Sequence, residues 1–234
     1  MIVPRQLVLE LPHREALGRD DLLVSRSNDA AVRAIDSWPD WPHAGLVLVG
    51  SPGSGKTHLV EVWRQRSGAV RLDAAAVSGD PADLIGDAPA IAVEDCGPGL
   101  DEAAMFHLLN AAERADLPVL LTSREPPPRW TLGLSDLNSR LSRLPVVEVA
   151  PPDEEVLQAV VIKLFADRQI AVDEAVLRYI LVRMERSFAA ARDIVARLDR
   201  LAAESKRPIS RSLAARALAE AHTLANLESP GSHE

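Results

Sequence analysis

Eight consecutive residues have the spacing G-x-x-x-x-G-K-T of a phosphate-binding loop, which we call the phosphate loop: Gly50, Ser51, Pro52, Gly53, Ser54, Gly55, Lys56 and Thr57. Glycines in such a loop let backbone N–H groups converge on an anion. Lys56 would reach the outer phosphates, and the Thr57 hydroxyl would bind Mg²⁺. An apolar run precedes the loop and a helical pattern follows it, as a phosphate site requires. The sequence therefore predicts that the chain binds a nucleoside diphosphate or triphosphate.

A pair of acids ends another apolar run. Glu94 and Asp95 follow Ile91-Ala92-Val93, at the expected place for residues that hold Mg²⁺ and activate water. The roles of the two acids can be assigned in two ways, which depend on the register of the strand end. In one, Glu94 holds the metal and Asp95 is a shorter-reaching base. In the other, Asp95 holds the metal and Cys96 stands where the base should be. Both registers predict weak intrinsic hydrolysis.

Two further groups of side chains could act on phosphates. Thr122 and Ser123 end a third apolar run, and their hydroxyls could contact a γ-phosphate. Arg140 and Arg143 precede the last apolar run, and an arginine there could point into the nucleotide of a neighbouring subunit. Such an arginine accelerates phosphoryl transfer by about 10³–10⁵ in known systems. The alternative is that both arginines belong to a solvated helix face.

The elements that must position these residues alternate along the chain. Five short apolar runs, at 46–49, 69–72, 90–93, 119–122 and 146–149, predict strands, and 101–115 has the apolar spacing of a helix. Strands that alternate with helices indicate an α/β domain with a five-stranded parallel sheet over residues 18–150.

Composition shifts at Pro151-Pro152, after which every pattern is helical. We expect helices at about 153–167, 173–184, 187–204 and 210–222, where acidic residues favour the first two starts. These helices form a small helical domain, residues 151–223, that we call the lid because it is expected to cap the nucleotide. Residues 224–234 are poor in apolar residues and are expected to be a disordered tail.

Composition excludes several classes of function. The 234 residues carry a formal charge of −8 without a Lys/Arg block, so we expect no direct sequence-specific DNA binding. Cys96 is the single cysteine, no secretion signal is recognised, and no apolar run approaches a membrane span. The predicted location is the cytoplasm. The four tryptophans are scattered, and the histidines lack metal-ligand spacing.

Several segments taken in order resemble one family. They are Gly55-Lys56-Thr57-His58-Leu59, Met105-Phe106-His107-Leu108-Leu109-Asn110, Leu121-Thr122-Ser123-Arg124-Glu125-Pro126-Pro127, Leu134-Ser135-Asp136-Leu137-Asn138-Ser139-Arg140-Leu141 and Val24-Ser25-Arg26-Ser27-Asn28. The chain resembles the bacterial replication-initiator ATPases of the AAA+ class, the DnaA family. It is most similar to their shortened relatives, called Hda, which regulate the initiator. The resemblance covers about residues 18–222.

The resemblance implies residue roles. His58 belongs to the nucleotide site, Thr122 and Ser123 lie at the first sensor of the γ-phosphate, and Arg140 matches the arginine finger. The family's second sensor is an arginine in R-S-N-x-R, where this chain has Ala190; Arg192 is a candidate substitute. This departure suggests that ADP, rather than ATP, is the working ligand.

The first 17 residues form an arm that resembles a clamp-binding peptide. Gln6-Leu7-Val8-Leu9-Glu10-Leu11 is similar to the Q-L-x-L-x-L peptide by which such regulators bind the replicative sliding clamp. Gln6 would hydrogen-bond at the rim of a pocket, and Leu7, Leu9 and Leu11 would form the extended apolar segment. The alternative is an ordinary amphipathic first strand.

These features lead to one functional hypothesis and two competitors. The hypothesis is a negative regulator that docks on the clamp and uses Arg140 to promote hydrolysis of the ATP held by a DnaA-type initiator. The competitors are a stand-alone AAA+ ATPase such as a helicase loader, and a small-molecule kinase, which would need an acceptor-binding insertion. A homodimer is also left open.

Overall fold

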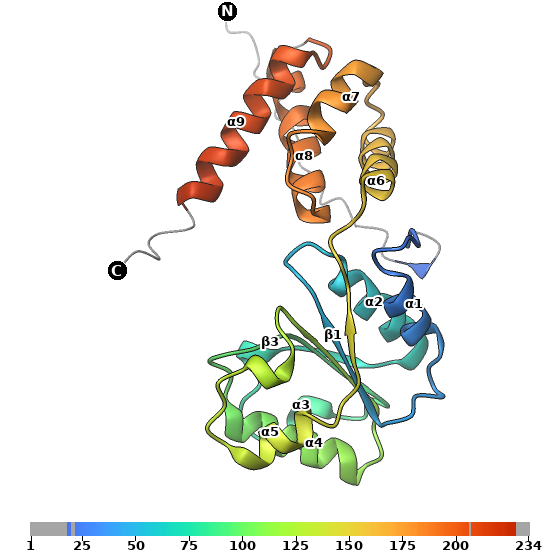
Figure 1. Cartoon of the computed structure of the whole chain (residues 1–234), viewed down its shortest axis with the longest axis vertical. Helices are drawn as coiled ribbons and strands as arrows, with labels where there is room; N and C mark the ends of the chain where they lie inside the picture. The colour runs from blue at the N-terminus through green and yellow to red at the C-terminus, as the bar shows by residue number, and fades with distance from the viewer. Residues whose placement is uncertain (1–17, 20–21, 206, 228–234) are drawn as a thin grey trace, which may run out of the picture.

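A parallel five-stranded sheet forms the centre of the larger domain (Figure 1). The computed structural model describes residues 18–19, 22–205 and 207–227. The strands are β1 (Gly45–Val49), β2 (Val70–Asp73), β3 (Ile91–Cys96), β4 (Val119–Ser123) and β5 (Val146–Glu148). They lie in the order β2-β3-β4-β1-β5, so β1, which leads into the phosphate loop, has β4 and β5 as neighbours. The α/β fold and all five predicted strands are confirmed.

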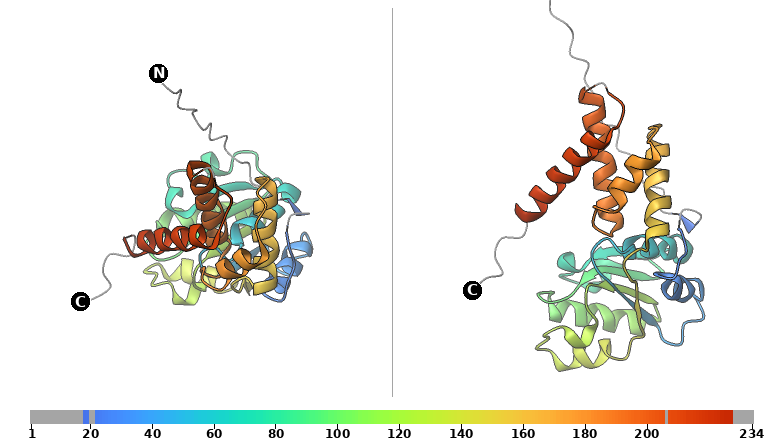
Figure 2. Two further views of the ribbon diagram at one scale, coloured as in Figure 1. Left: turned by 90° about the horizontal axis from the view of Figure 1, so that it is seen from above. Right: turned by 45° about the horizontal axis from the view of Figure 1, so that its top comes forward.

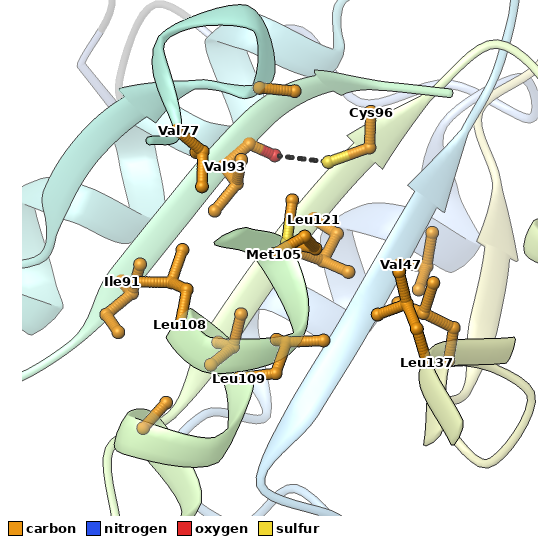
Figure 3. Packing of buried hydrophobic residues seen from close by; sticks show 14 of the residues in the cluster. Val47, Val77, Ile91, Val93, Cys96, Met105, Leu108, Leu109, Leu121 and Leu137 are labelled. Carbon is orange, nitrogen blue, oxygen red and sulfur yellow. Dashed lines mark hydrogen bonds between the residues drawn. The ribbon is translucent and has the colours of Figure 1, made fainter. Parts of the chain in front are cut away.

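Alternate residues of the strands supply two separate cores, one on each face of the sheet. Val47, Ile91 and Leu121 face the helices α4 (Glu102–Arg114) and α5 (Ser135–Leu141). Figure 3 shows this cluster, in which the Cys96 thiol donates a hydrogen bond to the Val93 carbonyl at 3.6 Å. Leu48 and Ala92 face the opposite way, toward α1 (Asp29–Asp36) and α2 (Lys56–Ser67). Burial on both faces explains why the strands read as continuous apolar runs.

Beyond β5 the chain forms the four helices of the lid: α6 (Glu154–Asp167), α7 (Glu174–Leu181), α8 (Phe188–Ser205) and α9 (Arg211–Leu227). They enclose a core of their own around Phe165, Ile180 and Leu198. Asp153 and Asp173 cap α6 and α7 by accepting backbone N–H bonds, as their places in the sequence predicted. In Figure 1 and in the right view of Figure 2 the lid lies above the α/β domain, and α9 projects to one side.

Two helix boundaries differ from the sequence prediction. Helix α7 ends at Leu181, three residues before the predicted end at residue 184. The prediction was too long because the buried Met184 continues the apolar spacing, although the backbone has left the helix before that residue. Helix α9 continues to Leu227, past the predicted end at residue 222, so residues 224–227 are helical rather than part of a disordered tail. A short helix α3 (Pro81–Ile85), like α1, was not predicted.

Trp38 and Trp41, which are close in the sequence, both contact the more distant Trp63. Trp63 is fully buried on α2; Trp41 stacks on it with 5.4 Å between ring centroids, and Trp38 meets it edge-on at 6.2 Å. The segment that carries Trp38 and Trp41 is therefore held against α2, the helix that begins at Lys56.

Candidate nucleotide-binding site

The phosphate loop lies between a buried strand and the start of a helix. All five residues of β1 are buried, and α2 begins at Lys56, so the last two residues of the loop form the start of the helix. Gly55, the N-cap of α2, has φ +104°, a left-handed backbone that favours glycine. The first N–H groups of a helix have no partner within it and carry a partial positive charge, so this end of α2 suits an anion.

The lid rests directly on the phosphate loop. The backbone N–H of Phe188, the first residue of α8, donates to the Gly53 carbonyl at 2.8 Å. Ser187 caps α8 by accepting from the Ala190 N–H at 3.0 Å. Gly53 has φ +71°, and a Cβ built on it would lie 2.8 Å from the Ser187 Cβ and 3.2 Å from the Ala189 Cβ. Only a residue without a side chain allows the lid to approach the loop this closely.

A cavity of about 620 Å³ lies between the loop and the lid. Its size is within the usual range of small-molecule sites. Both domains line it. The α/β domain supplies the loop residues Pro52 to Thr57 with Leu22, Leu23, Asn28, His58, Leu59, Asp95, Arg124 and Val149; the lid supplies Val160, Lys163, Leu164, Asp167, Arg168, Phe188, Ala189, Arg192, Asp193 and Ala196.

Lys56 is folded back onto the loop that it would serve. Its Nζ donates to the Gly50 carbonyl at 2.7 Å and to the Ser51 carbonyl at 2.9 Å. Burial is the largest cause of a lowered Lys56 pKa; the nearby Asp95 carboxylate opposes this shift and the Arg124 guanidinium adds to it. Gly50 and Ser51 do not line the cavity themselves, but their carbonyls position the ammonium group that does.

The two acids at the end of β3 lie in different surroundings. Glu94 is buried, and its Oε2 accepts a hydrogen bond from the Thr57 hydroxyl at 2.6 Å. Asp95 is exposed and lines the cavity. The register of β3 against β4 shifts between Val93 and Cys96, and Asp95 has φ +55°. This bulge turns the two neighbouring carboxylates to different surroundings and places Glu94 beside Thr57.

Thr122 and Ser123 are not among the residues that line the cavity. Both residues are buried. The Thr122 Oγ1 accepts from the Asp95 N–H at 3.1 Å, and the Ser123 hydroxyl donates to the Glu125 carbonyl at 2.8 Å. Their geometry therefore makes them supports of the β3 bulge and of the turn after β4.

Several cavity residues were not predicted from their types and spacing. Arg124, one residue beyond the expected sensor, lines the cavity near Lys56. Asn28 is buried at its edge, where its amide donates to the Leu23 carbonyl and its oxygen accepts from the Ser25 N–H. Arg192 does line the cavity from α8. Asn28 and Arg124 both stand in segments that resemble the family, and that position was the signal that could have indicated them.

No family model matches the chain, but it is similar in sequence to DnaA proteins and in fold to DnaA and RuvB. The chromosomal replication initiator protein DnaA of Thermomicrobium roseum is 26% identical over 220 residues, which cover 84% of this chain and 47% of that protein. Domain III of the Thermotoga maritima replication initiation protein DnaA superposes with a TM-score of 0.74 at 15% identity, covering 90% of this chain and 98% of the domain.

The chain is similar in sequence to DnaA proteins and has the fold of DnaA domain III. AMPPCP-bound DnaA from Aquifex aeolicus also has this fold, with a TM-score of 0.56 at 18% identity over 71% of this chain and 60% of the other. The DnaA-like chain spans about half the length of the curated relatives it matches.

In this DnaA-like chain Arg140 lies on α5, outside the set of residues that line the cavity. Its Nη1 pairs with the Glu113 carboxylate of α4 at 2.5 Å, and its guanidinium lies 5.9 Å from the centre of the Phe106 ring. The side chain is 28% exposed. Arg143, the competing arginine, is exposed, and no ion pair of it is found within the described residues.

The remaining predictions concern the clamp-binding residues, a membrane span and a metal site formed by His, Cys, Asp and Glu. Gln6, Leu7, Leu9 and Leu11 lie outside the described residues. Among the residues that are described, no helix has the length and apolar content needed to cross a bilayer. No cluster of three or more His, Cys, Asp and Glu side chains suited to a metal occurs in the same part of the chain.

Proposed function

We propose that this protein is an adenine-nucleotide-binding AAA+ regulator of chromosome replication initiation. It docks on the sliding clamp and stimulates hydrolysis of the ATP bound to a DnaA-type initiator, and so acts as a negative regulator. The observation that carries the proposal is the position of Arg140. Its partly exposed guanidinium lies on α5 and does not line the chain's own nucleotide cavity, so a phosphate that it contacts belongs to another subunit.

The cavity and the relatives support binding of ADP or ATP. The cavity combines a phosphate loop with side chains from the lid, and one structural relative was solved with AMPPCP. Magnesium takes its ligands from one or two carboxylates together with substrate phosphates. Thr57, Glu94 and Asp95 are the residues that would hold the ion: Thr57 and Asp95 line the cavity, and the Glu94 carboxylate accepts a hydrogen bond from the Thr57 hydroxyl. The ion, when bound, neutralises phosphate charge.

Two glutamates of helix α4 position Arg140. Glu102, at the start of α4, accepts from the backbone N–H groups of Gly133 at 3.0 Å and Leu134 at 2.6 Å, which fixes the segment that enters α5. Near the other end of α4, Glu113 pairs with the guanidinium. An exposed ion pair of this kind contributes little stability, so Arg140 can leave Glu113 for a phosphate at small cost.

The chain's own hydrolysis is expected to be weak. The only carboxylate near Lys56 that lines the cavity, within the residues the structure describes, is the short side chain of Asp95. Ala190 replaces the family's sensing arginine. Arg192 lines the cavity and is proposed to take that role. Nucleotide held without turnover would stabilise the closed arrangement of lid and loop.

The decisive experiment follows the hydrolysis of labelled ATP on the initiator in the presence of DNA-loaded clamp. Wild-type protein should accelerate it, and Arg140→Ala should remove at least about 100-fold of that acceleration. Arg143→Ala is the matched control, because Arg143 is two positions past α5 and also exposed. Equal stimulation by wild type and Arg140→Ala would refute the mechanism.

Docking on the clamp is tested separately. The double change Gln6→Ala and Leu9→Ala should abolish retention on immobilised clamp, while Arg140→Ala should be retained normally. Retention that the double change does not alter would remove the docking part of the proposal.

The competing function, a stand-alone ATPase, is favoured by one observation: Asp95 does face the cavity. It predicts steady-state turnover without a partner that disappears in Lys56→Ala. A rate that Lys56→Ala leaves unchanged would exclude this competitor.

A further inference from the structure

An arginine from the neighbouring strand contacts the buried carboxylate beside the phosphate loop. Glu94 uses one oxygen to accept from the Thr57 hydroxyl at 2.6 Å, and Arg71 forms an ion pair with its other oxygen, Oε1. The Glu94 side chain is 7% exposed, whereas that of Arg71 is 50% exposed. One oxygen of the carboxylate therefore accepts a hydrogen bond, and the other has an ionic contact with Arg71 but accepts no hydrogen bond from the described residues.

The sheet register explains how these side chains meet. Strands β2 and β3 are parallel, with Arg71 opposite Ala92 and Asp73 opposite Glu94. Residues two apart on a strand, and residues opposite each other on neighbouring strands, point to the same face of a sheet. Arg71 and Glu94 consequently share the face on which Ala92 packs, and α2 covers that face. Thr57 lies in the first turn of α2, directly beside the end of β3.

Among the cationic side chains near Glu94 that the structure describes, Arg71 is the one that forms an ion pair with it. Lys56 interacts electrostatically with Glu94, Asp95 and Arg124, but its ammonium group is bonded to loop carbonyls. Glu61 is the other carboxylate that Arg71 influences, and its pKa is lowered chiefly by the hydrogen bond from Arg64. Glu61 therefore already has its own arginine, at 2.8 Å.

We propose that Arg71 is a positioning residue that neutralises Glu94 and thereby makes nucleotide binding by this chain largely independent of Mg²⁺. A fixed guanidinium beside the carboxylate weakens the attraction of that carboxylate for a divalent cation. Magnesium gives up its hydration water reluctantly and depends on such carboxylates for binding. With Glu94 neutralised, the charge of the phosphates is met by cationic side chains that line the cavity, such as Lys56 and Arg192. This inference goes beyond the initiator-directed function and requires only that ADP binds in the cavity.

The test compares the affinity for a fluorescent ADP analogue in excess MgCl₂ and in EDTA. For the wild type the two dissociation constants should differ by less than about threefold, and for Arg71→Gln by more than about tenfold. Glutamine keeps a hydrogen-bond donor and removes the charge. Arg64→Gln is the matched control, because it removes a nearby charge that pairs with Glu61 rather than Glu94; it should behave like the wild type.

The ratio of the two dissociation constants separates positioning from a merely structural role. If Arg71 only supported the fold, Arg71→Gln would weaken binding equally with and without Mg²⁺, and an unchanged ratio would overturn the proposal. A strong Mg²⁺ requirement in the wild type would overturn it without any variant, so the test does not depend on the variant folding. Absence of ADP binding under both conditions would also overturn the proposal. The clamp and initiator assays test the proposed function separately and do not depend on this result.

Discussion

Gly53 joins the phosphate loop to the lid, and a single methyl group at this position should weaken nucleotide binding. The Gly53 carbonyl accepts the Phe188 N–H at 2.8 Å, and a Cβ at position 53 would lie 2.8 Å from the Ser187 Cβ. Real Cβ atoms are almost never this close to another heavy atom, so in Gly53→Ala either the loop or the start of α8 must move.

The size of the effect has two parts. A left-handed backbone costs a residue with a Cβ about 1–2 kcal/mol, and overpacking typically costs about 1–3 kcal/mol. Gly79→Ala isolates the first part, because Gly79 has φ +81° and its Cβ would meet no atom within 4 Å. The overpacking energy destabilises the contact between the loop and the lid, and lid residues line the cavity. The dissociation constant for ADP should therefore rise by about 5- to 150-fold in Gly53→Ala relative to Gly79→Ala.

The assay is a fluorescence titration of a labelled ADP into each variant, after thermal unfolding has shown that both are folded. If Gly53→Ala bound ADP as tightly as Gly79→Ala, the contact between loop and lid would have no part in binding, and the reasoning would be wrong.

Three other predictions concern single buried residues. Because burial lowers the pKa of Lys56, ADP affinity should fall as the pH rises through that lowered value, and Lys56→Arg should flatten the profile measured in the same titration. Burial raises the pKa of the Cys96 thiol to about 12, so iodoacetamide should modify it only after unfolding in urea; rapid modification of the folded protein, read by mass spectrometry, would contradict this. Trp63→Ala should lower the free energy of unfolding by about 3–5 kcal/mol in urea titrations, since Trp63 is fully buried between Trp38 and Trp41.

The sequence predicted the features that depend on local pattern. The phosphate loop, the five strands and the capped starts of α6 and α7 are each specified by residues adjacent along the chain, such as Gly55-Lys56-Thr57 and Asp153. The two registers for Glu94 and Asp95 could not be separated in this way. The choice between them depends on a bulge in β3 whose backbone is held by Thr122 on another strand.

Contacts between elements that are distant in the sequence could not be predicted from local sequence patterns. Arg71 meets Glu94 only because β2 is the neighbour of β3, and strand order is not encoded in any short motif. Arg124 and the lid residue Lys163 line the same cavity because the lid folds back over the loop. Ser123 shows the converse: its type suited a phosphate contact, but the Glu125 carbonyl already accepts its hydrogen bond.

The two glutamates of α4 also determine how variants in this region should be interpreted. Glu102 anchors the entrance to α5 and Glu113 holds the side chain near its end, while Met105 and Leu108 fasten α4 itself to the sheet. A substitution buried under α4 can therefore displace Arg140 without touching it. Loss of stimulation in such a variant would report misplacement of an intact guanidinium, and a crystal structure of the variant would be needed before the altered residue is assigned any contact with a partner.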